Sequence, residues 1–475
     1  MNPKRLASGD FLWLGLVLLF ALGIAFLLPV TPQDYWWYLR VGRDTLAAGA
    51  IPRVDALSFS QAGAPVVYHS WLAAILFFLV YKLGGLSLSV LLRGLLVGAA
   101  YAVVWVSARR AGAGRLGASL ALLAAVLTSS NNWSLRPQLF AYPLFALALW
   151  ALYEWQRGRD RPLWLLPFVS LLWVNLHGSF VILVLLTGAA LVCGQGARKP
   201  MALAFAGVLA ATLVNPRFAG AWTYVFSSVT AASSQLFSAE WRPPVNVGWQ
   251  MNIFFVWLLG FPLLAALSKH RLSRLEWVWF LGFGALALWG LRYVVWFVLL
   301  LAVLTPLLLA GWERALVGEA RPGLPAFNLG LAAVFVLLPL AFLPGLRSAW
   351  WKQAPPDTEA TPLAAAAWLA DHPGLSGPLF SEIGFSSYLE FALPSRPTWI
   401  DTRFEVFPVT QWQSYQAINS AAWDWQSRLD ATGVNLLMVS KAGQAQLVRA
   451  LDASGAWCAV YQDDVARIYT RGACR

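Results

Sequence analysis

Long apolar segments recur along almost the whole of this 475-residue chain, and no other feature restricts its fold so strongly. Hydrophobic residues make up 59% of the sequence and charged residues only 12%, about half of the ~25% that soluble globular domains carry. Many of the apolar segments approach the ~20 residues that a helix needs to cross a bilayer. The sequence therefore predicts a polytopic α-helical membrane protein.

Basic residues set the predicted topology, because short loops rich in Lys and Arg stay on the cytoplasmic side. Lys4 and Arg5 place the N-terminus in the cytoplasm, and the apolar stretch after them is too long for a secretory signal peptide. The segment 70–82 is short for a crossing, so we expect an interfacial helix there. Later basic clusters then all fall inside, so the net charge of +12 does not indicate a nucleic-acid partner.

The charge pattern gives about 11 transmembrane helices with the C-terminus on the extracytoplasmic side. The expected spans are 11–29, 86–107, 116–130, 138–155, 163–177, 179–196, 201–215, 252–268, 275–290, 293–311 and 327–344. Three outer loops then stand out, at 30–85, 130–137 and 215–251.

After residue 344 the apolar helices give way to shorter segments of alternating type. "LAAAAWLADHP" predicts an amphipathic helix, "GPLFSE" and "RPTWIDTR" predict short strands, and "WCAVYQDDVARIYTR" predicts a hairpin. We therefore expect a transmembrane domain at 1–344, carrying the outer loop 30–85, and a small extracytoplasmic α/β domain at 345–475. Cys458 and Cys474 lie in the second domain, where an oxidising compartment would allow a disulfide.

The first outer loop begins with an acid, Asp34, just after a Thr-Pro pair typical of a helix start. In the ordinary structural interpretation, Thr31 caps a juxtamembrane helix, and Trp36 and Trp37 anchor it at the membrane interface. That interpretation does not account for the charged residues that crowd the same loop, where positive charge is otherwise sparse. These residues are Arg40, Arg43, Asp44 and Arg53.

The other outer loops and helix ends add polar residues on the same predicted side of the membrane. Each has an ordinary alternative: Asn175 could bond within the bundle, His177 could be a satisfied helix-end residue, and Arg292 could snorkel. Together they describe an outer-leaflet cavity in which arginines suit a phosphate, aromatic rings suit a sugar or isoprenoid, and a carboxylate suits proton removal. The candidate substrate-binding residues are Trp37, Arg40, His69, Arg136, Gln138, Asn175, His177, Glu240 and Arg292, and the candidate catalytic residue is Asp34.

Six stretches carry a family resemblance by their order along nearly the whole chain. They are "DYWWYLRVGRDTLAAGAIPRVDALSFSQAGAPVVYHSWL", "LRPQLFAYPLFAL", "WVNLHGSF", "LVNPRF", "SAEWRPP" and "YLEFALPSRPTWIDTRFEVFP". In these residues the chain resembles the GT-C superfamily of polytopic glycosyltransferases, and within it a broad group of bacterial membrane proteins. More distant members are the protein O-mannosyltransferases, oligosaccharyltransferases and lipid A aminoarabinose transferases.

The resemblance implies a polyprenyl-phosphate-linked sugar as donor and a lipid, glycan or protein as acceptor. It implies a bacterial cytoplasmic (inner) membrane, with membrane lipids around the protein. It also implies an acidic residue in the first outer loop as base or substrate orienter, which by position is Asp34. An interfacial helix after that loop, matching 70–82, is a further feature of the superfamily.

Two departures from the family pattern affect the expected mechanism. The mannosyltransferases commonly show two adjacent acids where this chain has Gln33 and Asp34. Oligosaccharyltransferases bind a divalent cation with acids from two outer loops, whereas the second loop here, "SSNNWSLRPQ", contains none. We therefore expect an inverting, metal-independent reaction, with a divalent cation left open through Glu240, Asp44 or Asp55.

Asp401 and Arg403, in "SRPTWIDTRFE", allow two interpretations. They could end a strand and pair within the small domain, or the domain could cover the cavity and help to select the acceptor.

Two other classes of protein compete with the glycosyltransferase interpretation. A lipid or polysaccharide transporter or flippase would place polar groups near the membrane midplane, with broken helices or repeats, whereas the mid-span positions here are apolar. A non-catalytic envelope-assembly protein would explain an outer domain but not a cavity lined with arginines and acids. Convergence of Asp34, His69, His177, Glu240 and Arg292 in one cavity would favour the enzyme.

Overall fold

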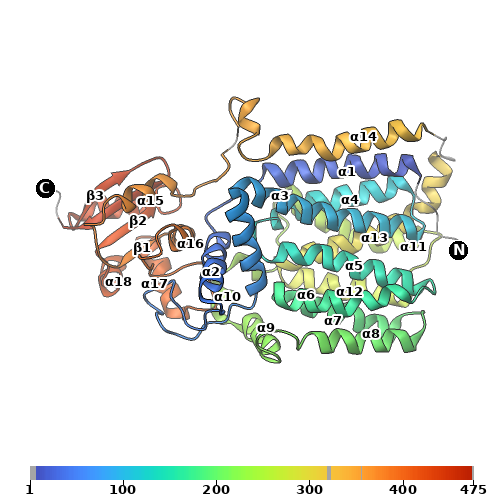
Figure 1. The fold of residues 1–475 in the computed structure, drawn as a ribbon, viewed down its shortest axis with the longest axis horizontal. Coiled ribbons are helices and arrows are strands. Elements are labelled where there is room, and N and C mark those ends of the chain that lie inside the picture. Colours follow the sequence, from blue (N-terminus) through green and yellow to red (C-terminus); the bar gives the residue numbers. More distant parts are fainter. Residues whose placement is uncertain (1–6, 318–322, 355, 473–475) are drawn as a thin grey trace. The chain divides into compact units, whose positions relative to one another are not determined.

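The structure is a computed structural model that describes residues 7–317, 323–354 and 356–472 (Figure 1). Its contacts divide the chain into two compact units, each assembled from three separate stretches. The helical unit comprises Met1–Leu28, Leu83–Val225 and Ala239–Pro355. The α/β unit comprises Pro29–Lys82, Phe226–Ser238 and Pro356–Arg475.

Every predicted span overlaps a helix in the described part of the chain, with bounds that differ by up to several residues. The helices are α1 (Ser8–Leu27), the second part of α3 (Trp71–Ala111), α4 (Arg115–Ser129), α5 (Gln138–Gln156), α6 (Leu165–Leu176), α7 (Val181–Cys193), α8 (Arg198–Ala211), α11 (Trp249–Leu267), α12 (Arg274–Trp289), α13 (Val294–Val317) and α14 (Pro325–Leu337). Within the helical unit, α1 packs on α14 and α13 packs on α4 and α12 (Figure 1).

The predicted number of crossings is not confirmed. In the described residues, 5 helices are long and apolar enough to span a membrane: Ser8–Leu27, Trp71–Ala111, Trp249–Leu267, Leu291–Leu316 and Pro325–Phe342. Most of the other helices at predicted spans have 12 to 16 residues. That is fewer than the ~20 residues that match the hydrocarbon thickness. Several helices that are long and apolar enough to cross a membrane nevertheless indicate a multi-pass membrane protein.

Helix α3 is broken in its first third. Gly84 and Gly85 leave the helical conformation, and Gly85, at φ 58° and ψ −146°, occupies a region that favours glycine. The 41 residues of α3 would be far longer than one membrane crossing if straight. The break separates Trp71–Lys82, which belongs to the α/β unit, from the predicted span 86–107, and the interfacial position of 70–82 stays a prediction.

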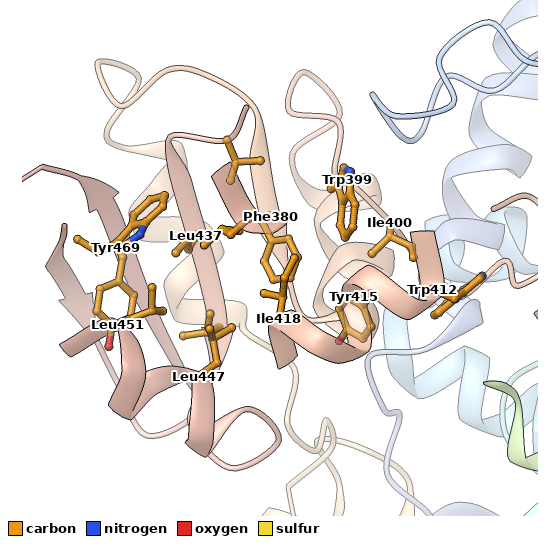
Figure 2. Close-up of a cluster of buried hydrophobic side chains, with 14 of the residues drawn as sticks. Phe380, Trp399, Ile400, Trp412, Tyr415, Ile418, Leu437, Leu447, Leu451 and Tyr469 are labelled. Carbon is orange, nitrogen blue, oxygen red and sulfur yellow. The ribbon is translucent and has the colours of Figure 1, made fainter. Parts of the chain in front are cut away.

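A 4-stranded sheet in the order β1-β2-β4-β3 forms the centre of the α/β unit. Its strands are β1 (Leu379–Ser381), β2 (Leu436–Ser440), β3 (Trp457–Gln462) and β4 (Ala466–Arg471), and only β1 and β2 pair in parallel. All 5 residues of β2 are buried, because apolar side chains cover both of its faces. Leu437 belongs to one apolar cluster, shown in Figure 2, and Leu436 to the other.

Helices flank this sheet. They are α15 (Leu363–Ala370), α16 (Ile383–Ala392), α17 (Val409–Asn419), α18 (Trp425–Ala431) and α19 (Ala445–Ser454). In Figure 2, Leu447 and Leu451 of α19 and Ile418 of α17 approach the same apolar cluster as Leu437. The predicted helix at "LAAAAWLADHP", the strand at "GPLFSE" and the closing hairpin are confirmed as α15, β1 and β3–β4.

The strand predicted at "RPTWIDTR" is wrong. Only Thr398 pairs there, through isolated bridges to Ser58 and Leu379. The chain then turns, because a side-chain oxygen of Asp401 accepts the backbone N–H of Arg403 at 2.7 Å and takes that donor from any strand ladder.

Residues of the first outer loop belong to the α/β unit. Helix α2 (Asp34–Ala48) packs against α16 and against the start of α3. A Cβ on Gly42 would lie 2.1 Å from the carbonyl oxygen of Ala74, so only glycine allows this approach of the two backbones. The predicted extracytoplasmic position of residues 345–475 stays a prediction.

Candidate functional site

Helix α2 places Asp34 in its first turn. The N-cap is Gln33, which has an extended conformation and no side-chain capping bond, so the prediction that Thr31 caps this helix is wrong. The helix starts later because Val30 pairs with Thr358 and the carbonyl of Thr31 already accepts the N–H of Gln33. A carboxylate in a first turn is favoured by the N-terminal end of the helix dipole.

The carboxylate of Asp34 is hydrogen-bonded to the C-terminal part of the chain. The Thr402 hydroxyl donates to Asp34 Oδ1 at 2.6 Å, and the Ser387 hydroxyl lies 3.0 Å from that of Thr402. A carboxylate only accepts and a hydroxyl has one proton, so Thr402 donates to Asp34 and Ser387 donates to Thr402. Asp34 is half-buried and Ser387 is buried.

Arg403, the next residue, is the centre of a buried ionic cluster. Its Nη2 and Nε bond to Asp401 at 2.6 and 2.9 Å, and its Nη1 bonds to Asp55 at 2.6 Å and to the Tyr68 hydroxyl at 2.9 Å. Asp55 also accepts the Ser58 hydroxyl at 2.5 Å. The expected pairing of Asp401 with Arg403 is therefore confirmed, and the same guanidinium also holds the first outer loop.

The pKa values of two buried acids, Asp55 in this cluster and Glu390 beside it, are shifted in opposite directions. Burial acts to raise the pKa of Asp55, but the charge and hydrogen bond of Arg403 outweigh it, and the pKa lies below its usual value. Burial, reinforced by the nearby charge of Asp401, raises the pKa of Glu390 well above its usual value. Oε1 of Glu390 accepts the Thr398 hydroxyl at 3.1 Å.

The predicted residues Trp37 and Arg40 of α2 have packing partners in the same unit. Trp37 is 7% exposed and stacks on Tyr38 with ring centroids 3.7 Å apart. Arg40 bonds to Asp44 at 2.5 Å and to the carbonyl of Glu390 at 2.9 Å, which ties α2 to α16. Trp36, at 2% exposure, is also buried, so the alternative that this pair anchors at the membrane surface is not supported.

His69 lies half-buried two residues before the start of α3, next to the Tyr68 that contacts Arg403.

In the helical unit, Arg136, Glu240 and Arg292 come together. Arg136, just before α5, pairs with Glu240 of the short helix Ala239–Trp241. Arg292, before α13, places its guanidinium over the Trp241 ring at 4.3 Å. Burial acts to raise the pKa of Glu240, but Arg136 and Arg292 hold it below its usual value. The backbone N–H of Leu291 bonds to the Arg242 carbonyl at 2.9 Å and joins the two turns.

The bonds that Asn175 and His177 make agree with the ordinary structural roles considered above, and a role in substrate binding stays a prediction. The Asn175 amide donates to the carbonyls of Leu171 and Val214 at 2.9 Å each, which ties α6 to the end of α8. His177 ends α6, and its Nδ1 lies 2.7 Å from the Ser179 hydroxyl. Gln138 is buried at the first position of α5.

The candidate residues thus form two groups, one in each unit. Asp34 and His69 belong to the α/β unit, whereas His177, Glu240 and Arg292 belong to the helical unit. Their convergence in one cavity stays a prediction.

Thr402, Ser387, Tyr68 and Glu390 were not singled out from the sequence. The only available signal was position: Thr402 lies between Asp401 and Arg403, and Tyr68 precedes His69.

The acids do not fit a divalent cation site. Among the described residues, no group of three His, Cys, Asp or Glu side chains could hold a metal ion. The acids considered as partners of Asp34 are each bonded to arginine: Asp44 to Arg40, Asp55 to Arg403 and Glu240 to Arg136.

Comparison with solved structures identifies the fold. The apo form of the Archaeoglobus fulgidus oligosaccharyltransferase aligns with a TM-score of 0.62 at 12% identity, over 92% of this chain and 71% of that one. The archaeal oligosaccharyltransferase AglB from the same organism, in complex with an inhibitory peptide and a dolichol-phosphate, aligns at 0.59 and 11%, over 96% and 74%. A mutant of arabinofuranosyltransferase AftD from Mycobacteria aligns at 0.55 and 17%, over 100% of this chain but only 42% of that one.

These proteins are glycosyltransferases of the GT-C superfamily, so this chain has the GT-C fold. At such low identity the likeness establishes the fold alone. No family model matches the sequence, and no curated protein sequence matches it significantly.

Proposed function

We propose that this protein is an inverting glycosyltransferase that moves a sugar from a polyprenyl-phosphate donor to an acceptor at the outer face of the bacterial inner membrane. Asp34 is the general base. The GT-C fold supports the reaction class, and one observation carries the assignment: the Asp34 carboxylate, in the first turn of α2, accepts a 2.6 Å hydrogen bond from Thr402. The acceptor is a lipid, a glycan or a protein.

In the proposed reaction, an acceptor hydroxyl or amine attacks the anomeric carbon of the donor sugar. The bond between that carbon and the phosphate oxygen breaks, and the polyprenyl phosphate leaves with the electron pair. Asp34 takes the proton of the acceptor, a contribution typically worth about 10²- to 10⁴-fold in rate. Because the phosphate leaves as a stable anion, the reaction needs no separate general acid.

Arg292 is the candidate ligand of the donor phosphate. Its guanidinium lies over Trp241 at 4.3 Å and is half-buried, and it makes no ion pair or side-chain hydrogen bond with the residues that the structure describes. A guanidinium offers a planar fork of donors that matches a phosphate and keeps its charge at any physiological pH. Stacking on the indole fixes the plane of that fork.

A disulfide supports the proposed outer location of the C-terminal part. Cys458 of β3 is disulfide-bonded, and its predicted partner Cys474 lies outside the described residues. Disulfides persist in oxidising compartments and are rare in the cytosol. Cys193, in the helical unit, is a free thiol.

The test is a purified Asp34→Asn variant, assayed against a panel of decaprenyl-phosphate-linked sugars. Asparagine keeps the shape of aspartate but cannot take the acceptor proton, so we expect sugar transfer to fall by at least about 100-fold. Donor binding, measured by retention of the lipid-linked sugar, should be unchanged.

The matched control is Asp44→Asn, which removes an acid from the same helix. Asp44 is about one-third exposed and pairs with Arg40 and Arg43, so this variant should transfer sugar within a few-fold of the wild type. Wild-type turnover by Asp34→Asn would refute the assignment of Asp34 as base.

A further inference from the structure

We propose that Thr402 is a positioning residue for the Asp34 carboxylate, so that the C-terminal segment 398–403 completes the catalytic site. The inference rests on the proposed role of Asp34 as base and adds a partner for it. The two residues are 368 positions apart in the sequence, yet the Thr402 hydroxyl donates to Asp34 Oδ1 at 2.6 Å. That separation lies within the 2.5–2.7 Å typical of a hydroxyl bonded to a charged carboxylate.

The direction of the hydrogen bonds leaves little freedom to the carboxylate. Ser387, on α16, is fully buried, and its hydroxyl donates to Thr402, 3.0 Å away. Thr402 in turn donates to Asp34, because Asp34 supplies only acceptors. Each hydroxyl donates its one proton within this series of hydrogen bonds. Rotation of the Asp34 carboxylate would therefore break a charge-assisted hydrogen bond.

The residues on both sides of Thr402 are buried and hydrogen-bonded. Asp401 and Arg403 are 0% and 3% exposed, and the guanidinium of Arg403 is bonded to Asp401, Asp55 and Tyr68. The Thr402 hydroxyl is therefore held by a buried, hydrogen-bonded segment. Catalytic groups generally need this support, because an error of about 0.5 Å in the position of a base lowers its efficiency.

This arrangement gives the C-terminal part a defined role in catalysis. A residue that acts through Asp34 alone changes the rate of the chemical step and leaves donor binding as it is. A residue that contacts the donor changes its KM. The two roles are therefore separable by kinetics.

The experiment compares Thr402→Val with Thr402→Ser in the full-length protein, using the decaprenyl-phosphate sugar that the wild type consumes. Valine keeps the shape of threonine without the hydroxyl, so kcat should fall about 10- to 100-fold while the donor KM stays within about threefold. Serine restores the hydroxyl, and kcat should return to within about threefold of the wild type. Thr470→Val, on β4 of the same unit, is the matched control and should leave kcat unchanged.

The double variant Asp34→Asn with Thr402→Val should be no slower than Asp34→Asn alone, since Thr402 acts only through Asp34. Wild-type kcat in Thr402→Val, a raised KM at unchanged kcat, or a serine variant as slow as the valine variant would each overturn the inference. If Asp34→Asn turns over like the wild type, the proposed function fails and the inference falls with it. If Asp34→Asn is inactive while Thr402→Val is fully active, the inference alone fails.

A second variant covers the case in which Thr402→Val does not fold. Ser387→Ala removes the donor to Thr402 and leaves the threonine in place. Its kcat should fall several-fold at unchanged KM, and an unchanged kcat would overturn the proposed chain of hydrogen bonds.

Discussion

Replacing Arg403 with methionine tests the packing of the first outer loop against the C-terminal segment. Methionine has a similar length but no charge and no hydrogen-bond donor. The change removes the bonds from Arg403 to Asp401, Asp55 and Tyr68 and leaves two carboxylates, 0% and 2% exposed, without their cation.

The expected loss of stability in Arg403→Met follows from the burial of these two carboxylates. Removing one partner of a buried ion pair typically destabilises a protein by about 3–5 kcal/mol, because the remaining charge stays buried without compensation. Two observations place the estimate near the lower end: Asp55 keeps its bond from Ser58, and Asp401 keeps the backbone N–H of residue 403. We therefore expect about 3 kcal/mol, equivalent to an opening constant about 100-fold larger.

The loss of stability caused by Arg403→Met should depend on pH. Because the pKa of Asp55 lies below its usual value in the folded protein, the pairing with Arg403 adds stability above the unfolded pKa of ~3.9 and loses it as the pH falls through the folded pKa. The difference between the wild type and Arg403→Met should thus be largest at neutral pH and shrink below about pH 4.

Hydrogen exchange of backbone amides measures this opening locally. Peptides from residues 50–68 and 398–407 should exchange about 100-fold faster in Arg403→Met, while peptides from α13 should not change. Arg403→Lys keeps the charge but not the planar fork, so its exchange should be intermediate. The control is Arg467→Met, since Arg467 pairs with the partly exposed Asp452 and such surface pairs contribute at most about 1 kcal/mol. Unchanged exchange in both test peptides of Arg403→Met would refute the reasoning.

Two further predictions concern single charges. Burial raises the pKa of Glu390 well above its usual value, so folding binds a proton there and stability falls as the pH rises above the unfolded pKa of ~4.3. Glu390→Gln should therefore unfold at a higher temperature than the wild type at pH 8, with the difference vanishing near pH 4; a difference independent of pH would contradict this. Arg292→Gln should raise the donor KM about 10- to 100-fold, the loss expected for hydrogen bonds from a charged donor to phosphate, with a retained cooperative unfolding transition as the control for folding; an unchanged KM would exclude Arg292 as a phosphate ligand.

The helices could be predicted from the sequence because their signal is local. Every expected span overlaps a helix, and the closing hairpin, at β3 and β4, was also found from alternation and turn residues. The number of crossings is not confirmed, because composition marks a segment as apolar without fixing how many residues stay helical. Helix α6, for example, has 12 residues.

The partners of the site residues could not be predicted in the same way. Asp34 and Arg403 stood out as charges in unusual places, but their partners Thr402 and Asp55 lie 368 and 348 positions away. Periodicity relates residues within one helix or strand and carries no information on pairs so distant. The strand predicted at "RPTWIDTR" is wrong for the same reason, because its turn depends on a side chain that bonds to the backbone rather than on strand propensity.

These long-range bonds change how a functional effect in the C-terminal segment should be interpreted. Segment 398–403 holds the candidate base through Thr402 and the first outer loop through Arg403. A substitution there can abolish transfer by disturbing Asp34, without any contact between the segment and an acceptor. Acceptor selection by this segment would instead change the KM for one acceptor relative to another while hydrogen exchange in α2 stays that of the wild type. The two roles are therefore distinguished by measuring acceptor preference and α2 exchange on the same variant.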